Sequence, residues 1–124
     1  MSASFLPMSR PYAIGQVGLT QDPPGRLLRV IEIMRFRLSD VADEDAFLGA
    51  DREVQSEFAY QQPGLLRRTT ARGEQGEWVV VDLWRSVEEA EACSARWGQD
   101  AVTAAFMRFV AGDSVKVERF FERD

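Results

Sequence analysis

The spacing of apolar residues changes along the chain between the pattern of a strand and the pattern of a helix. The clearest such change lies between positions 76 and 93. Residues 78–84 are rich in β-branched and aromatic side chains, which favours a strand. Ser86 and Glu89 then form a capping box, in which each side chain satisfies the other residue's backbone donor. The pattern therefore predicts a strand that passes directly into a helix.

The same periodicities predict three more strands and a first helix. The strands are expected over Leu28 to Leu38, Leu65 to Arg72 and Ser114 to Glu122, and a hairpin at 73–76 joins the second of these to the strand at 78–84. Pro63-Gly64 is expected to end the first helix. The apolar side chains of that helix recur at helical spacing, at Phe47, Ala50, Val54 and Phe58.

The helix that begins at Ser86 completes the order of elements. Its apolar stripe consists of Ala90, Cys93 and Trp97, and Gly98 is expected to end it. Asp100 then caps a short continuation whose apolar face is Val102, Phe106 and Phe109. The order β-α-β-β-α-β predicts an α+β fold of the ferredoxin-like type, with a four-stranded antiparallel sheet and helices on one face.

The chain is expected to form one domain over residues 27–124, preceded by an irregular N-terminal arm at 1–26. Four of the five prolines lie in that arm, although Tyr12 to Val17 could form a short edge strand. In the strand at 78–84 both alternating faces are apolar, which helices on one side of the sheet would leave half exposed. A second copy that packs sheet against sheet is the simplest cover, so we expect a homodimer with two-fold symmetry.

Charge and cysteine usage narrow the class of protein. The net charge is −5, and the arginines are interspersed with acids, which argues against nucleic-acid binding. The N-terminus lacks the features of a signal peptide, and no segment approaches 18 apolar residues, so neither export nor a membrane partner is expected. Cys93 is the only cysteine, which excludes an internal disulfide and fits a cytoplasmic protein.

Several segments together resemble the dimeric α+β barrel superfamily, and within it the antibiotic biosynthesis monooxygenase-like proteins. They are Arg29 to Leu38, the Phe47 helix, Pro63 to Arg67, and Asp82-Leu83-Trp84-Arg85-Ser86 followed by Glu88, Glu89 and Ala90. The resemblance implies a dimer with a pocket between sheet and helices in each subunit. It also implies one of several activities, because the superfamily includes cofactor-free oxygenases of aromatic polyketides or quinols, haem-degrading enzymes, isomerases and lyases.

The chain departs from that family at informative places. It contains no histidine and no asparagine, and Cys93 stands where many members carry a histidine, nine residues after the tryptophan. Haem degradation and asparagine-assisted oxygenation are therefore disfavoured. Metal ligation is also not expected, because only carboxylates remain as ligands and none has ligand spacing, and no cofactor is predicted.

Three side chains are the catalytic candidates: Asp82, Trp84 and Tyr60. The Trp84 indole could stack on a planar substrate and donate a hydrogen bond to a carbonyl, or simply pack in the core. Tyr60 follows the first helix, where its phenol could reach the mouth of the pocket or pack at its rim. The expected pocket walls are Trp97, Phe106, Phe58 and Cys93, whose thiol is expected to behave as a small hydrophobe.

Asp82 has two interpretations. It shares a strand face with Trp84, so a covered face would raise the pKa of the carboxyl and suit it as a general base. Alternatively it forms a structural ion pair with a neighbouring-strand arginine, and this alternative is favoured because most buried acids are paired for structural reasons. The candidates for that partner are Arg35, Arg37 and Arg68. Glu32, between Ile31 and Ile33, has the same two interpretations.

The first functional hypothesis is a cofactor-independent monooxygenase that acts on a small planar aromatic of the polyketide or quinol type. The alternatives are a non-catalytic homodimer that binds a small hydrophobic ligand, and a non-oxidative isomerase or cyclase. Convergence of Asp82, Tyr60 and Trp84 on a cavity of at least roughly 300 Å³ would favour catalysis. A paired Asp82 in a filled interior would favour the binding or structural protein.

Overall fold

The computed structural model describes residues 28–123, so the expected N-terminal arm and the strand at Tyr12 to Val17 lie outside the described residues. The order of elements confirms the predicted β-α-β-β-α-β sequence, with short 3-10 turns added. The elements are β1 (Val30–Phe36), α2 (Glu44–Glu57), η2 (Ala59–Gln61), β2 (Leu65–Arg72), β3 (Trp78–Trp84), α3 (Val87–Arg96), α4 (Ala101–Met107), η3 (Gly112–Ser114) and β4 (Lys116–Phe121).

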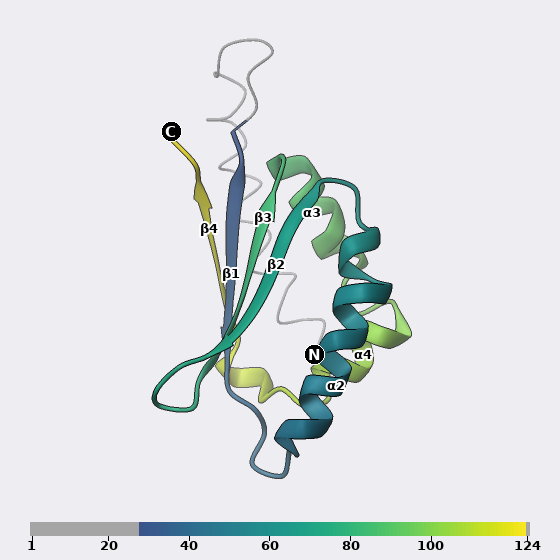
Figure 1. Ribbon diagram of the computed structural model, residues 1–124, viewed down its shortest axis with the longest axis vertical. Coiled ribbons are helices and arrows are strands. Elements are labelled where there is room, and N and C mark those ends of the chain that lie inside the picture. The colour runs from purple at the N-terminus through teal and green to yellow at the C-terminus, as the bar shows by residue number, and fades with distance from the viewer. Residues whose placement is uncertain (1–27, 124) are drawn as a thin grey trace.

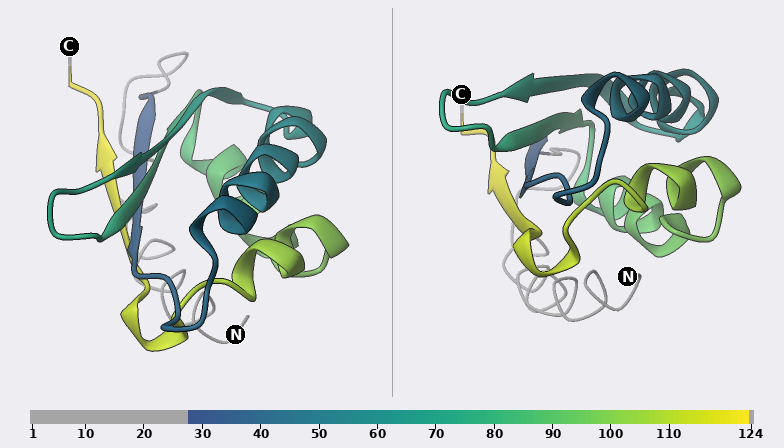
Figure 2. Two further views of the ribbon diagram at one scale, coloured as in Figure 1. Left: turned by 60° about the horizontal axis from the view of Figure 1, so that its bottom comes forward. Right: turned by 90° about the horizontal axis from the view of Figure 1, so that it is seen from below.

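The four strands form one antiparallel sheet in the order β2-β3-β1-β4. Helices α2, α3 and α4 all lie on the same side of this sheet (Figures 1 and 2). This is the ferredoxin-like α+β fold that the sequence predicts. Within residues 28–123, no helix covers the opposite face of the sheet, and no helix is long and apolar enough to cross a membrane.

The hairpin between β2 and β3 forms at the predicted glycines. The Gly73 amide donates to the Glu77 carbonyl at 2.7 Å, and the Gly76 amide donates to the Gly73 carbonyl at 3.2 Å. Gly76 has a φ of 85°, a left-handed conformation that side chains with a Cβ rarely adopt. The turn therefore sets the register in which β2 and β3 pair.

Side-chain caps fix where the helices start. Asp43 caps α2 by accepting from the Asp45 amide at 3.0 Å, and Asp100 caps α4 by accepting from the Val102 amide at 2.8 Å, as predicted for Asp100. Ser86 caps α3 through the Glu89 amide at 3.3 Å. The predicted return bond differs, because the Glu89 carboxylate binds the Ser86 hydroxyl at 3.0 Å and the Arg85 guanidinium rather than the Ser86 amide.

The first helix is shorter than predicted. It ends at Glu57, and the chain continues through η2 before it reaches Pro63-Gly64. Phe58 leaves the helical conformation with φ −126° and ψ −60°. The Phe58 side chain is nevertheless buried, with 4% of it exposed.

The core lies between the inner face of the sheet and the helices, and it consists of two apolar clusters. The larger cluster is built on edge-to-face aromatic contacts of Phe47 with Phe36 and Trp78, whose ring centroids lie 5.8 and 5.0 Å from that of Phe47. The smaller cluster consists of Val30, Trp84, Val87 and Ala90. Phe47, Val54 and Phe106 are fully buried in the larger cluster, as their helical spacing predicts.

Candidate functional site

A row of four charged side chains crosses the inner face of the sheet between the two apolar clusters. Cross-strand pairing places Arg68 of β2 opposite Asp82 of β3, Asp82 opposite Glu32 of β1, and Glu32 opposite Arg119 of β4. Apart from Thr70, their neighbours on the same face are mostly apolar, so all four side chains lie in a mostly apolar layer. Charged groups in such a layer need partners or a changed protonation state.

Both arginines of the row have carboxylate partners. Arg119 Nη2 lies 2.6 Å from Glu32 Oε2, and its Nη1 lies 3.3 Å from Glu91 Oε2 on α3. Arg68 turns away from β3, because its Nη2 lies 2.8 Å from Asp51 Oδ1 on α2. Glu32 is therefore held in an ion pair, the structural alternative that the sequence left open for it.

Asp82 has no such partner. Within residues 28–123 it makes no ion pair, and its Oδ1 is buried without a hydrogen bond. The favoured prediction of an ion pair with Arg35, Arg37 or Arg68 is therefore wrong. Arg35 lies on the other face of the sheet and pairs with Glu118 at 2.8 Å, Arg37 follows the end of β1 and is exposed, and Arg68 is bound to Asp51.

The environment of Asp82 favours its neutral form. The pKa of Asp82 is raised to about 7, mainly because the carboxyl group is buried and also because of the charge of Glu32, while Arg68 acts to lower it. The pKa of Glu32 is also raised by burial, against the opposing effect of Arg119. Near neutral pH, Asp82 can thus accept or donate a proton, as a general acid–base group must.

Trp84 ends β3 two residues after Asp82 and lies on the same face of the sheet. It is 1% exposed and packs in the smaller core cluster. Its Nε1 is buried and has no hydrogen-bond partner among the described residues. An unpaired buried N–H is costly, and a bound acceptor would satisfy it.

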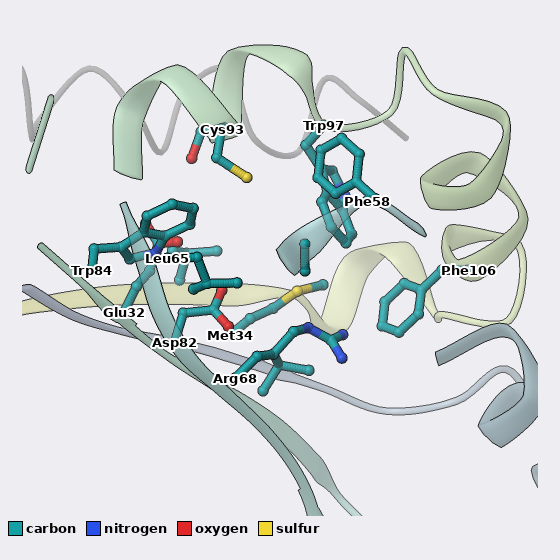
Figure 3. A pocket seen from close by; sticks show the side chains of 14 residues that line it. Glu32, Met34, Phe58, Leu65, Arg68, Asp82, Trp84, Cys93, Trp97 and Phe106 are labelled. Atoms are coloured by element: carbon teal, nitrogen blue, oxygen red, sulfur yellow. The ribbon is translucent and has the colours of Figure 1, made fainter. Parts of the chain in front are cut away.

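Asp82 and Trp84 line one cavity between the sheet and the helices (Figure 3). The four residues predicted as pocket walls also line it, with Trp84 and Cys93 toward one end and Phe58, Trp97 and Phe106 toward the other. The Trp97 ring packs edge-on against Phe58 and Phe106, with centroid distances of 5.7 Å in each case. Burial raises the pKa of Cys93 to about 12, so its thiol stays protonated and is a poor nucleophile.

Tyr60 lies elsewhere. It is 44% exposed and does not line the cavity, and its hydroxyl binds the backbone of β2. The Arg68 amide donates to it at 2.8 Å, and the hydroxyl donates to the Arg68 carbonyl at 3.4 Å. Since β2 is an edge strand, Tyr60 satisfies backbone groups at the free edge of the sheet, which is a structural role.

The Arg68–Asp51 pair is part of the site that the sequence analysis missed. Asp51 is 6% exposed, and its Oδ1 also accepts from Thr70 Oγ1 at 2.9 Å. A signal was present, because Asp51 lies four residues after Phe47 and three before Val54, on the buried face of the helix. A carboxylate on an apolar helix face indicates a buried cation nearby.

The cavity is small. The space open to the centres of water molecules is about 50 Å³, which is room for a few waters. Pockets for drug-sized ligands measure roughly 300–1,000 Å³, so the cavity does not reach the size expected to favour catalysis, and of the three catalytic candidates only Asp82 and Trp84 line it. Among the described residues, no group of three or more cysteine, aspartate or glutamate side chains could hold a metal ion.

Solved structures with the same fold are similar to this chain at low sequence identity. SnoaB, a cofactor-independent oxygenase from Streptomyces nogalater, is 18% identical with a TM-score of 0.65, over 78% of this chain and 95% of that chain. Two proposed antibiotic biosynthesis monooxygenases, from Nitrosomonas europaea and Chloroflexus aurantiacus, have TM-scores of 0.60 at 14% and 16% identity. They cover 78% and 77% of this chain and 92% and 94% of their own.

The sequence itself matches no protein-family model and no curated protein. The structural likeness therefore establishes the fold of the antibiotic biosynthesis monooxygenase-like proteins, which the sequence resemblance implies. One fold supports many reactions, so any activity has to be argued from the cavity and its residues.

Proposed function

We propose that this protein, which has the fold of the antibiotic biosynthesis monooxygenase-like proteins, is a cofactor-free oxygenase of a small phenolic aromatic. One observation carries the proposal: Asp82 and Trp84 line the same cavity, and each has a buried polar atom, the acceptor Oδ1 and the donor Nε1, without a hydrogen-bond partner among the described residues. Asp82 removes a phenolic proton, and the Trp84 indole donates to a neighbouring oxygen of the substrate.

The substrate supplies the electrons in this reaction. A hydroquinone and O₂ give a hydroxyquinone and water, so one oxygen atom enters the ring and the other leaves as water. Deprotonation by Asp82 raises the electron density of the ring, which promotes its reaction with oxygen. The apolar walls formed by Phe58, Trp97 and Phe106 keep water from the anion.

Size and charge both define the substrate class. The small cavity favours a single ring over the fused rings of a polyketide. The charged side chains in and around the cavity are the acids Asp51, Asp82, Glu32 and Glu91 and the cations Arg68 and Arg119. Since acids outnumber cations, the site favours a neutral phenol and disfavours a carboxylated one.

The proposal is tested by oxygen uptake with single-ring hydroquinones, their carboxylated analogues and a tricyclic anthrone. Asp82→Asn and Trp84→Phe are each expected to lower kcat by about 10²-fold or more, because each removes a group that acts on the reacting atoms. Trp78→Phe is the matched control. Trp78 lies on the same face of β3 but packs against Phe47 away from the cavity, so turnover should persist.

The results distinguish several conclusions. Uptake with single-ring substrates that depends on Asp82 supports the proposal. Faster turnover of the anthrone would contradict the size argument, and uptake no faster than autoxidation would overturn the oxygenase. A ligand that binds without turnover would then favour the alternative of a small-molecule binding protein.

A non-oxidative acid–base enzyme is the second candidate, and one observation favours it. Glu32 and Asp82 lie opposite each other in register, both line the cavity, and both have a raised pKa. Two such carboxyl groups can move a proton between two positions of one substrate. Incorporation of deuterium from solvent into product without oxygen would identify this isomerase or cyclase activity.

We also propose that the protein acts as a homodimer through the outer face of its sheet. That face carries five half-buried apolar residues, Ile31, Ile33, Val79, Val81 and Leu83, next to the exposed Arg35–Glu118 pair. On β4, Phe120 is 48% exposed. A second copy of the same sheet offers a self-complementary apolar cover.

A further inference from the structure

Arg68 forms its ion pair with an acid on a helix and not with the acid opposite it in the sheet. Its register partner on β3 is Asp82, on the same face of the sheet. Its guanidinium nevertheless binds Asp51 at 2.8 Å and Gln55 Oε1 at 3.3 Å, both on α2. The guanidinium carbon also lies 6.0 Å from the centre of the Phe106 ring.

Asp51 is itself held in place for this contact. Its Oδ1 accepts from both Arg68 and Thr70, and its side chain is 9% exposed, against 2% for that of Arg68. A buried pair of this kind keeps its geometry, because breaking it would leave an unpaired charge in the core. α2 therefore fixes the side on which the Arg68 charge lies.

We propose that Asp51 is a positioning residue that holds the Arg68 guanidinium away from Asp82 and so leaves Asp82 free to act as a base. The inference rests on the proposed function of Asp82, and it extends the site to α2. Without Asp51, Arg68 would have Asp82 as its remaining acid on the neighbouring strand. An Asp82 paired with Arg68 would be a weaker base and would no longer offer a free oxygen to the substrate.

The charges around Asp82 give the sign of the effect. The titratable and charged groups that face it are Glu32 on β1, Arg68 on β2, Asp51 on α2 and Cys93 on α3, with Arg119 of β4 held by Glu32. Asp51 and Glu32 raise the pKa of Asp82, and Arg68 lowers it. Loss of the Asp51 charge and release of Arg68 therefore both act to lower the pKa of Asp82.

The test compares Asp51→Asn with wild type through the carboxyl carbon resonance of Asp82, followed by NMR as the pH changes. The titration midpoint is expected to fall by at least about one pH unit, as an arginine close to a carboxylate typically produces. The low-pH limb of the oxygen-uptake profile should move by the same amount. Glu44→Gln is the matched control, because it breaks the exposed Arg72–Glu44 pair between the same helix and strand.

An unchanged midpoint in Asp51→Asn, or a shift no larger than that of Glu44→Gln, would overturn the inference. If Asp51→Asn does not fold, Arg68→Gln and the double variant Asp51→Asn/Arg68→Gln replace it. Arg68→Gln should raise the midpoint, and adding Asp51→Asn should then change it by well under one unit. A full shift in that background would mean that Asp51 acts without Arg68, which also contradicts the inference.

The two proposals fail in different ways. If wild type takes up no oxygen but the Asp82 midpoint moves in Asp51→Asn, the oxygenase is wrong and the positioning role stands. If uptake depends on Asp82 but the midpoint does not move, the oxygenase stands and Asp51 is only structural.

Discussion

Asp82 keeps its proton to a higher pH than an exposed aspartate, because it is buried and lies opposite Glu32 in the sheet. Arg68, which could stabilise its charged form, is paired with Asp51. The pKa rises from 3.8 to about 7. Proton binding and folding are therefore linked at this residue. Between about pH 4 and pH 7, Asp82 is protonated in the folded chain and ionised in the unfolded chain.

This linkage predicts how Asp82→Asn changes stability. A raised pKa contributes stability below the unfolded value near 4, and the contribution is lost as the pH rises through about 7. Asn has no charge to bury, so the variant should exceed wild type in stability at pH 8, by up to a few kcal/mol, and match it near pH 4. Urea unfolding at both pH values measures the difference, and an equal difference at the two would contradict the burial argument.

Trp84 illustrates a second consequence at the scale of single residues. Its Nε1 has no hydrogen-bond partner among the described residues, so Trp84 contributes to the core only through the apolar contacts of its ring. The polar atom is left without a partner. Residues of this kind, packed by one part and unsatisfied at another, are expected at functional sites.

At the scale of elements, the junction between η2 and β2 explains why Tyr60 does not line the cavity. The sheet has a register irregularity between Leu65 and Arg67, immediately before the Arg68 groups that Tyr60 binds. The phenol satisfies an edge-strand amide and carbonyl there. It also holds the strand that carries Arg68.

Tyr60→Phe tests this assignment. The variant keeps the ring and loses the hydroxyl, so stability should fall by about 1 kcal/mol, the usual contribution of such a hydrogen bond. Oxygen uptake at saturating substrate should remain within about twofold of wild type, because the hydroxyl does not line the cavity. Loss of turnover without loss of stability would return Tyr60 to the catalytic candidates.

For the whole molecule, the two faces of the sheet have different roles. The inner face carries the charged row and the cavity under the helices, and the outer face carries half-buried aliphatic side chains. A site on one face and an interface on the other would allow a dimer to form without obstructing the cavity.

The dimer is tested by light scattering at micromolar concentration, where wild type should have twice the mass of the chain. Val81→Lys places a charge opposite Ile33 on the outer face and should give a monomer, because an unpaired charge is costly in an apolar interface. Gln99→Lys adds the same charge at an exposed position after α3 and should remain dimeric. A monomeric wild type would refute the homodimer.

The sequence by itself determined the elements, because their signals are local. The local signals are the β-branched and aromatic residues at 78–84, the Ser86 and Asp100 caps, and the glycines at 73 and 76. Each acts within a few residues, and the structure contains the strand, helix starts and hairpin that they predict. The apolar stripes of the predicted helices also identified Phe58, Trp97 and Phe106 as residues that line the cavity, because an amphipathic helix buries only its apolar face.

Tertiary structure alone decided how the charges pair. The sequence offered Asp82 several arginines, and nothing local distinguishes Arg68 bound to Asp82 from Arg68 bound to Asp51. The choice depends on where the fold places α2 beside β2, which brings together residues far apart in the chain. Tyr60 was misplaced for the same reason, since its partner is the backbone of a strand edge whose position no short-range pattern encodes.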